Sequence, residues 1–209
     1  MQAIRWKRLG DLGLGTFYFL LALAPILKTY HAAAAGEHLL AVHYALSGAA
    51  TLIVAGLLLI RRKAILGSTR RREQVVAIVG SFAIIPLSAL PLTWQPDWLL
   101  EVSSVGFILA YAWIVWALMT LRRSFSIFPE ARTLITHGPY GLVRHPLYAA
   151  YFVTYTLLMI PRISLIAVAL AVVGIAAEVN RSRNEERVLR RAFDDYDQYA
   201  RRVLPFLPI

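Results

Sequence analysis

Two short polar stretches stand out in a chain that is otherwise rich in apolar residues. Residues 137–148, HGPYGLVRHPLY, hold two histidines, an arginine, two prolines and two tyrosines. Residues 178–186, EVNRSRNEE, hold three glutamates and two arginines. These residue types suit a polar ligand, because a carboxylate can hold an ammonium group and a guanidinium can hold a carboxylate through two hydrogen bonds. The alternative is an ordinary loop at a membrane surface, with side chains that only solvate it.

The second stretch has the spacing of one polar helix face. On an α-helix, Glu178, Arg181 and Glu185 lie on the same side, while Glu186 points away from it. An exposed ion pair between Arg181 and Glu185 would stabilise the helix only slightly, and this is the alternative to a functional role. The functional interpretation is that this helix face presents acidic and basic side chains together to a ligand.

The composition excludes several other kinds of site. The chain has no cysteine, so a disulfide framework, a thiolate nucleophile and a cysteine-ligated metal are excluded. The histidines lack the spacing of zinc ligands, and we expect no metal site. The sequence contains no Walker motif, no GxGxxG after a strand and no GxSxG, so it does not support a soluble nucleotide-binding fold or a serine hydrolase.

The rest of the chain predicts an all-α integral membrane protein. Of its 209 residues, 58% are apolar and only 16% are charged, which is outside the usual range of soluble domains. A membrane-spanning helix needs roughly 20 apolar residues. Four segments approach that length: Leu12–Thr29, Leu39–Ile60, Val75–Leu92 and Trp98–Leu121. A fifth apolar block, Leu147–Ala177, is too long for one ordinary span and is interrupted by Pro161 and Arg162.

The basic residues predict the orientation of these segments. Of the 22 lysines and arginines, 20 lie in residues 1–8, 61–72, 122–144 or 181–209. Placing all four groups in the cytoplasm makes the four spans alternate consistently, and it requires the fifth block to be a helical hairpin that turns near Arg162. The net charge of +10 therefore indicates a membrane protein, in the cell (inner) membrane with both termini cytoplasmic, and we expect no nucleic-acid partner.

The hairpin would bring the two polar stretches together. Residues 122–148 and 178–209 would meet at its two feet on the cytoplasmic face, and the C-terminal tail is predicted to be an amphipathic helix that covers them. No cleavage site follows the first apolar segment, so we expect an uncleaved first helix. We expect a single membrane domain over residues 1–209, with transmembrane helices in residues 1–97 and a catalytic region in residues 98–209.

The order of the motifs along the chain resembles that of a known family. The order LRRSFSI, TLITHGPYGLVRHPLY, an apolar hairpin, RSRNEERVL and DDYDQYARRVLPFLP is similar to that of the isoprenylcysteine carboxyl methyltransferase family. Related phospholipid methyltransferases share RHPxY followed by an apolar stretch and two glutamates. The resemblance covers roughly residues 120–208 and implies a membrane methyltransferase that uses S-adenosyl-L-methionine as its cofactor.

The resemblance also implies roles for particular residues. Arg181 would orient the methyl acceptor, and Arg181 and Glu185 are the candidate catalytic residues. The cofactor would be bound by Thr133, Leu134, Ile135, Tyr140, His145, Pro146, Leu147, Tyr148 and Glu185. The acceptor would be a lipophilic, isoprenoid-type or lipid-modified molecule that reaches the site from among the membrane lipids, and a carboxylate is one candidate for its reactive group.

Three positions depart from the family pattern, and two other functions stay open. The family often has glycine at Arg122 and Ala150 and arginine at Gly141, which leaves the acceptor undefined. One alternative is an NADPH-dependent reductase of unsaturated lipid, since the sterol reductases share a similar C-terminal architecture. The other is a non-catalytic membrane protein whose polar residues only organise its helices. The oligomeric state is not predicted.

Overall fold

The computed structural model describes residues 2–94 and 96–206, with side chains from residue 9 onward. It confirms an all-α membrane protein. The helices are α1 Gln2–Ala34, α2 His38–Ile60, α3 Arg71–Phe82, α4 Ile84–Ala89, α5 Asp97–Leu121, α6 Pro146–Met159, α7 Leu165–Ala192 and α8 Tyr196–Arg202. Short 3-10 turns are η1 Arg122–Ser124, η2 Gly138–Gly141 and η3 Ile160–Arg162, and two-residue strands are β1 Leu66–Gly67 and β2 Glu130–Ala131. Within these residues, 5 helical segments are long and apolar enough to cross a membrane.

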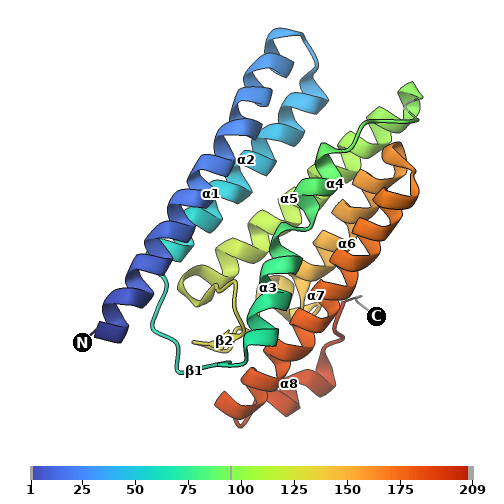
Figure 1. Ribbon diagram of the computed structural model, residues 1–209. Helices are drawn as coiled ribbons and strands as arrows, with labels where there is room; N and C mark the ends of the chain where they lie inside the picture. Colours follow the sequence, from blue (N-terminus) through green and yellow to red (C-terminus); the bar gives the residue numbers. More distant parts are fainter. Residues whose placement is uncertain (1, 95, 207–209) are drawn as a thin grey trace.

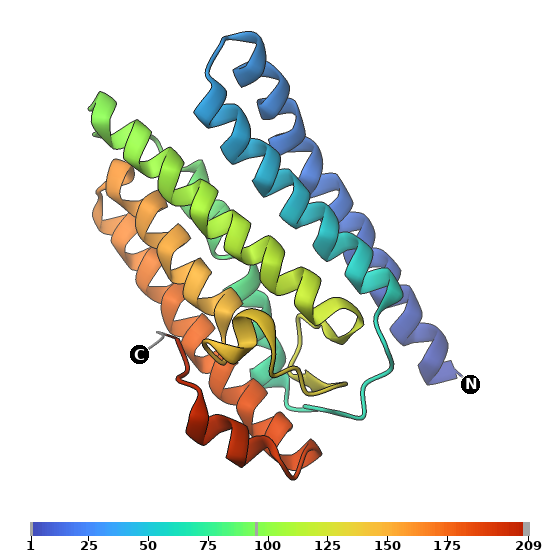
Figure 2. The same ribbon diagram turned by 180° about the vertical axis from the view of Figure 1, so that it is seen from behind.

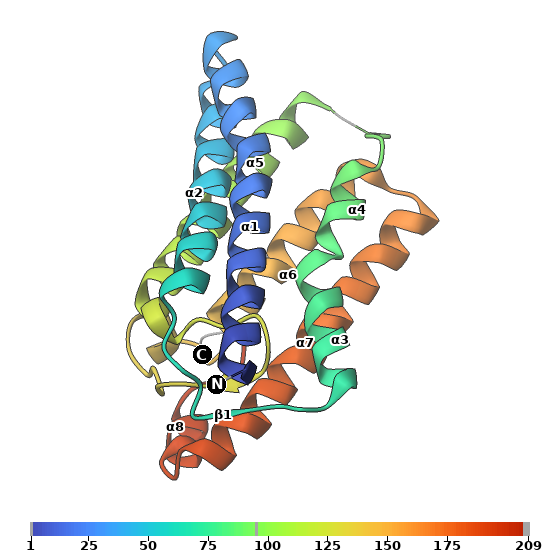
Figure 3. The ribbon, with the colours of Figure 1, turned by 60° about the vertical axis from the view of Figure 1, so that its left-hand side comes forward.

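The helices form two groups joined by α5. The helices α1 and α2 make an antiparallel hairpin on one side of the molecule, and α3, α4, α6 and α7 gather on the other, with α5 packed between α2 and α6 (Figures 1 and 2). The two strands, the turn η2 and α8 lie at one end, which is also the end where α1 begins (Figure 3). We call this the loop end. The four chain segments that hold most of the lysines and arginines thus meet at the loop end, as expected if successive spans cross the membrane in alternating directions.

The apolar block after Pro146 is the expected hairpin. Its turn is η3, and the carbonyl of Pro161 in that turn accepts hydrogen bonds from the backbone of Thr93 and Trp94 at 2.8 and 3.2 Å. Ser164 then caps α7, since its hydroxyl accepts from the backbone of Ala167 at 3.1 Å. The arms are unequal: α6 has 14 residues and α7 has 28. The longer arm carries the second polar stretch down to the loop end.

The third predicted span, Val75–Leu92, is not one regular helix. It is divided into α3 and α4 at Ala83. The reason is Pro86, which has no backbone N–H to donate to residue 82 and whose ring crowds that carbonyl. The break opens the helix toward the interior of the molecule, where Ser81, Phe82 and Ile84 line a cavity.

The core lies where α2, α5 and α6 meet. Its most buried members include Leu58, Ile114, Leu118 and Phe125, and packing of their side chains fixes α5 against α2. At the end of α5 the chain turns sharply through Arg122, whose φ is 48°. Glycine adopts positive φ without a Cβ penalty, so the sequence departure at this position leaves an arginine in a backbone conformation that suits glycine better.

Candidate active site

A network of charged residues holds the loop end together. The strands β1 and β2 pair as antiparallel neighbours and join the segment after α2 to the segment after α5. Arg61 pairs with Asp11 on α1, and its Nη1 lies 3.6 Å from a carboxylate oxygen of Glu130. Arg132 also pairs with Glu130 and donates to the carbonyl of Arg62 at 2.6 Å. This network fixes the residues that follow β2, which line the site.

A pocket at the loop end is lined by residues from both polar stretches. We call it the loop-end pocket. Its lining includes all of the predicted cofactor-binding and acceptor-orienting residues: Thr133, Leu134, Ile135, Tyr140, His145, Pro146, Leu147, Tyr148, Arg181 and Glu185. It also contains residues that were not predicted, among them Phe125, Arg132, Arg144, Tyr151, Leu189, Tyr196 and Tyr199. Residues far apart in the sequence therefore share one wall, because the hairpin returns the chain to the loop end.

Two hydrogen bonds connect the two polar stretches directly. The Tyr148 hydroxyl donates to Oε2 of Glu185 at 2.8 Å, and Nε2 of His145 lies 3.0 Å from Oε1 of Glu186. The His145 ring also lies beside Tyr148, with ring centroids 5.4 Å apart. Pro146 begins α6, where the missing N–H is not needed. The start of α6 and the end of the polar part of α7 are thus tied together.

Glu186 lies off the face of Glu178 and Arg181, as helical spacing predicts, and it is not among the described residues that line the loop-end pocket. Its carboxylate contacts His145, and it also lies 3.4 Å from Nη2 of Arg144 and 3.0 Å from Nη2 of Arg190. The turn formed by Arg144, His145 and Pro146, which we call the RHP turn, approaches α7 from the side on which Glu186 lies. Glu186 therefore holds the turn that carries His145.

The C-terminal tail closes the loop-end pocket, although not as one amphipathic helix. The helix α7 continues to Ala192, α8 is short, and the chain after it extends beside the RHP turn. Backbone hydrogen bonds run from Arg144 to the carbonyl of Leu204 at 2.8 Å and from His145 to the carbonyl of Pro205 at 2.9 Å. An amphipathic helix on the membrane surface would lack these backbone contacts, so they explain the extended form.

Tyrosines from α8 and η2 complete this closure. The Tyr199 hydroxyl donates to the backbone carbonyl of Tyr140 at 2.6 Å. Burial raises the pKa of Tyr199 to about 12 and raises the pKa of Tyr140 well above its ordinary value, with the nearby charge of Glu185 acting in the same direction on Tyr140. The Tyr199 hydroxyl therefore stays a neutral hydrogen-bond donor well above physiological pH.

Arg181 is buried and paired with Glu178, so the alternative of an exposed ion pair with Glu185 does not hold. Its Nη1 lies 3.3 Å from a carboxylate oxygen of Glu178, one helical turn earlier. Its Nε and Nη2 donate to the carbonyl of Ile127 at 3.2 and 2.9 Å. The guanidinium also lies 5.3 Å from the centre of the Tyr148 ring. Packing of α7 against the segment before β2 removes this residue from solvent.

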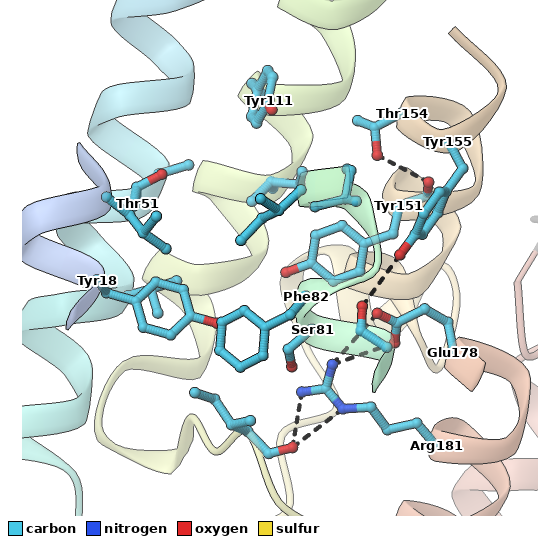
Figure 4. A pocket seen from close by; sticks show the side chains of 18 of the residues that line it. Tyr18, Thr51, Ser81, Phe82, Tyr111, Tyr151, Thr154, Tyr155, Glu178 and Arg181 are labelled. Atoms are coloured by element: carbon cyan, nitrogen blue, oxygen red, sulfur yellow. Dashed lines mark hydrogen bonds and ion pairs between the residues drawn. The ribbon is translucent and has the colours of Figure 1, made fainter. Parts of the chain in front are cut away.

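A second cavity lies deeper among the helices, on the other side of Arg181. It has a volume of about 220 Å³, and Figure 4 shows its polar side chains. We call it the membrane cavity. Most of its lining is apolar, and its polar members are Tyr18, Thr51, Ser81, Tyr111, Tyr151, Thr154, Tyr155, Glu178 and Arg181. Phe125, Tyr151 and Arg181 line both cavities, so the two spaces adjoin at these three residues.

Three residues that line the loop-end pocket each have a buried polar atom without a hydrogen-bond partner in the part of the chain that the structure describes. These atoms are Nη1 of Arg132, Nε of Arg144 and the hydroxyl of Tyr196. A buried donor without a partner costs stability, typically about 1–3 kcal/mol. Two of these groups are cationic and all three can donate, so the pocket is suited to a ligand with acceptor atoms or negative charge. In residues 2–94 and 96–206, no three histidine, aspartate or glutamate side chains gather as a metal site would require.

Comparison with known proteins agrees with this geometry. The sequence profile of the isoprenylcysteine carboxyl methyltransferase (ICMT) family matches residues 102–191. The chain is 33% identical over 147 residues to the nickel-cobalt-cadmium resistance protein NccN of Alcaligenes xylosoxydans xylosoxydans, covering 67% of this chain and 66% of the relative. It is 31% identical over 150 residues to the cobalt-zinc-cadmium resistance protein CzcN of Cupriavidus metallidurans, covering 67% of this chain and 65% of the relative. The chain thus spans just under two thirds of each relative's length.

The family match contains the lining of the loop-end pocket except Tyr196 and Tyr199. It begins in α5, includes the RHP turn and both arms of the hairpin, and ends at the last turn of α7. Through residues 102–191, the chain belongs to the isoprenylcysteine carboxyl methyltransferase family of membrane methyltransferases.

Proposed function

We propose that this protein transfers a methyl group from S-adenosylmethionine to a lipophilic acceptor at the cytoplasmic face of the cell membrane. The observation that carries the proposal is the loop-end pocket, in which ten residues implied by the family resemblance line one space. Family membership supports methyl transfer in general. The cofactor and the side of the membrane are part of the proposal.

The chemistry of the pocket fits the proposed cofactor. S-adenosylmethionine supplies, when bound, an electrophilic methyl group on a cationic sulfur, together with an ammonium and a carboxylate group. The rings of Tyr140 and Tyr148 and the carboxylate of Glu185 suit its positive groups. The unpaired donors of Arg132 and Arg144 suit its carboxylate.

The acceptor would occupy the membrane cavity. That cavity adjoins the loop-end pocket at Phe125, Tyr151 and Arg181, so a molecule whose apolar part stays among the helices can present its reactive group to the cofactor. Methyl transfer depends largely on holding donor and acceptor in line at close distance. Arg181, which borders both cavities, is the residue that we propose orients the acceptor.

Binding of the cofactor can be measured directly by calorimetry on the purified protein in detergent. We expect both S-adenosylmethionine and its demethylated product S-adenosylhomocysteine to bind. Glu185→Ala should weaken both by roughly 10- to 100-fold, since it removes a charged hydrogen-bond acceptor from the pocket. Glu101→Ala is the matched control, because Glu101 is exposed at the far end of α5.

Two results would contradict the proposal. One is the absence of binding of either compound to the wild-type protein. The other is binding of reduced nicotinamide dinucleotide without binding of S-adenosylmethionine, which would favour a lipid reductase.

A further inference from the structure

Glu178 is a buried carboxylate that the proposed cofactor site does not use. Its side chain is 1% exposed and lies in the wall of the membrane cavity, one helical turn from Arg181 (Figure 4). Gly80 on α3 makes room for it, since a Cβ at that position would lie 3.1 Å from the carboxyl carbon. The carboxylate is therefore held at a fixed place beside the space that an acceptor would occupy.

The charges of the membrane cavity are already balanced. Glu178 and Arg181 are the charged residues in its lining, and their side chains approach within 3.3 Å. An acceptor with a carboxylate head would have to compete with Glu178 for Arg181, and an ammonium head would have to compete with Arg181 for Glu178. Each exchange leaves one buried charge without its partner, which is costly in an apolar environment. The cavity thus favours an uncharged head group.

Glu178 still has capacity to accept a hydrogen bond from such a head. A carboxylate can accept about four hydrogen bonds. The contacts from Nη1 of Arg181 are long, at 3.3 and 3.5 Å. Tyr151, which borders both cavities, extends from α6 toward the middle of the same space (Figure 4). A polar hydrogen on the acceptor therefore finds a strong acceptor oxygen close to the junction with the loop-end pocket.

We infer that the methyl acceptor is an apolar molecule with an uncharged hydroxyl group, and that Glu178 takes up the proton of that hydroxyl during transfer. This inference rests on the proposed function. The hydroxyl oxygen forms a bond to the methyl carbon while the bond from that carbon to the sulfonium sulfur breaks. The bonding electron pair stays on sulfur, and the hydroxyl proton passes to a carboxylate oxygen of Glu178. The products are a methyl ether, a neutral thioether and a protonated Glu178.

A binding experiment without the cofactor tests the recognition step. The protein in lipid nanodiscs is titrated with a para-alkyl phenol, a fatty acid and a primary alkylamine whose tails have equal length. We expect the phenol to bind at least several-fold more tightly than the other two. Glu178→Gln should weaken phenol binding by roughly 10-fold or more, because a hydrogen bond to a charged acceptor becomes one to an amide. Glu101→Gln, in the exposed part of α5, should leave it unchanged.

A transfer assay with radiolabelled S-adenosylmethionine tests the proton step. Glu178→Gln should slow methylation of the phenol by roughly 10²- to 10⁴-fold, the range typical of a general base. Glu178→Asp, which keeps a carboxylate, should recover part of the rate. Affinity for S-adenosylhomocysteine should be unchanged in both variants, which shows that they are folded.

The inference is overturned if the wild-type protein binds or methylates the fatty acid or the alkylamine in preference to the phenol. It is also overturned if Glu178→Gln methylates the phenol at the wild-type rate. Failure of the proposed function is a separate result: the wild-type protein would not bind S-adenosylmethionine, while phenol binding that depends on Glu178 could still be measured.

Discussion

The loop-end pocket and the membrane cavity adjoin each other but are built in different ways. Most of the loop-end pocket comes from residues 121–151 and 181–199, two segments joined by one helical hairpin. The membrane cavity takes its lining from seven helices, α1 through α7. The first space is thus encoded by compact polar motifs, and the second by how distant apolar helices pack. Under the proposed function, the helices α1 to α4 would therefore contribute to acceptor choice together with α5 to α7.

Arg181 belongs to both spaces, so its loss should have the largest effect. Arg181→Ala leaves the buried carboxylate of Glu178 without its partner, which typically costs about 3–5 kcal/mol. We expect a large drop in the temperature of unfolding in detergent, together with weaker binding of both S-adenosylhomocysteine and the para-alkyl phenol. Adding Glu178→Gln to Arg181→Ala should restore much of the stability, because the buried charge is then removed. A double variant no more stable than Arg181→Ala would show that the pair is not the cause.

Gly174 offers a change confined to the membrane cavity. A Cβ at this position would lie 2.4 Å from a ring carbon of Tyr155, whose hydroxyl donates to the carbonyl of Gly80 at 3.3 Å. Gly174→Ala should therefore displace that ring and destabilise the fold by about 1–3 kcal/mol, as overpacking usually does. Calorimetry should show weaker binding of the para-alkyl phenol and unchanged binding of S-adenosylhomocysteine. Gly56→Ala is the control, since open space surrounds that position on α2. If Gly174→Ala weakened the binding of both ligands equally, the two spaces would not be separate.

The same contrast explains what could be predicted from the sequence. The meeting of Tyr148 with Glu185 follows from the helical hairpin that charge placement predicts. The partner of Glu186 could not be found from helical spacing, because spacing does not say from which side a loop approaches. Pro86 was a visible signal for the break between α3 and α4, since proline removes the hydrogen bond to residue 82.

No comparable sequence motif indicates the membrane cavity. Tyr18, Thr51 and Tyr151 lie in segments that are apolar on most sides, and aromatic or hydroxyl residues are ordinary in membrane helices. Nothing in their spacing indicates which of them face the same space. Their meeting depends on the packing of α2 against α5 and of α5 against α6, which is a tertiary property.

Tyr199 offers the smallest change, and it is confined to the loop-end pocket. Tyr199→Phe removes the hydrogen bond to the carbonyl of Tyr140, which should weaken docking of the tail by about 1 kcal/mol. We expect faster hydrogen exchange in residues 196–206 and a few-fold weaker binding of S-adenosylhomocysteine, with unchanged binding of the para-alkyl phenol. Tyr30→Phe, at an exposed position of α1, is the control.

The pH dependence of this effect distinguishes a buried phenol from an ordinary one. Burial raises the pKa of Tyr199 to about 12 in the folded protein, whereas the pKa of a tyrosine in the unfolded chain is about 10. A group whose pKa is raised by folding contributes stability that is complete below the unfolded pKa and is lost as the pH rises through the folded one. The difference between wild type and Tyr199→Phe in tail protection should therefore be constant between pH 6 and about 9 and shrink above about 10. Tyr140 and Tyr196 are present in both proteins, so their own titration largely cancels in the comparison. A difference that shrinks already near neutral pH would mean that the hydrogen bond to Tyr140 does not hold the tail.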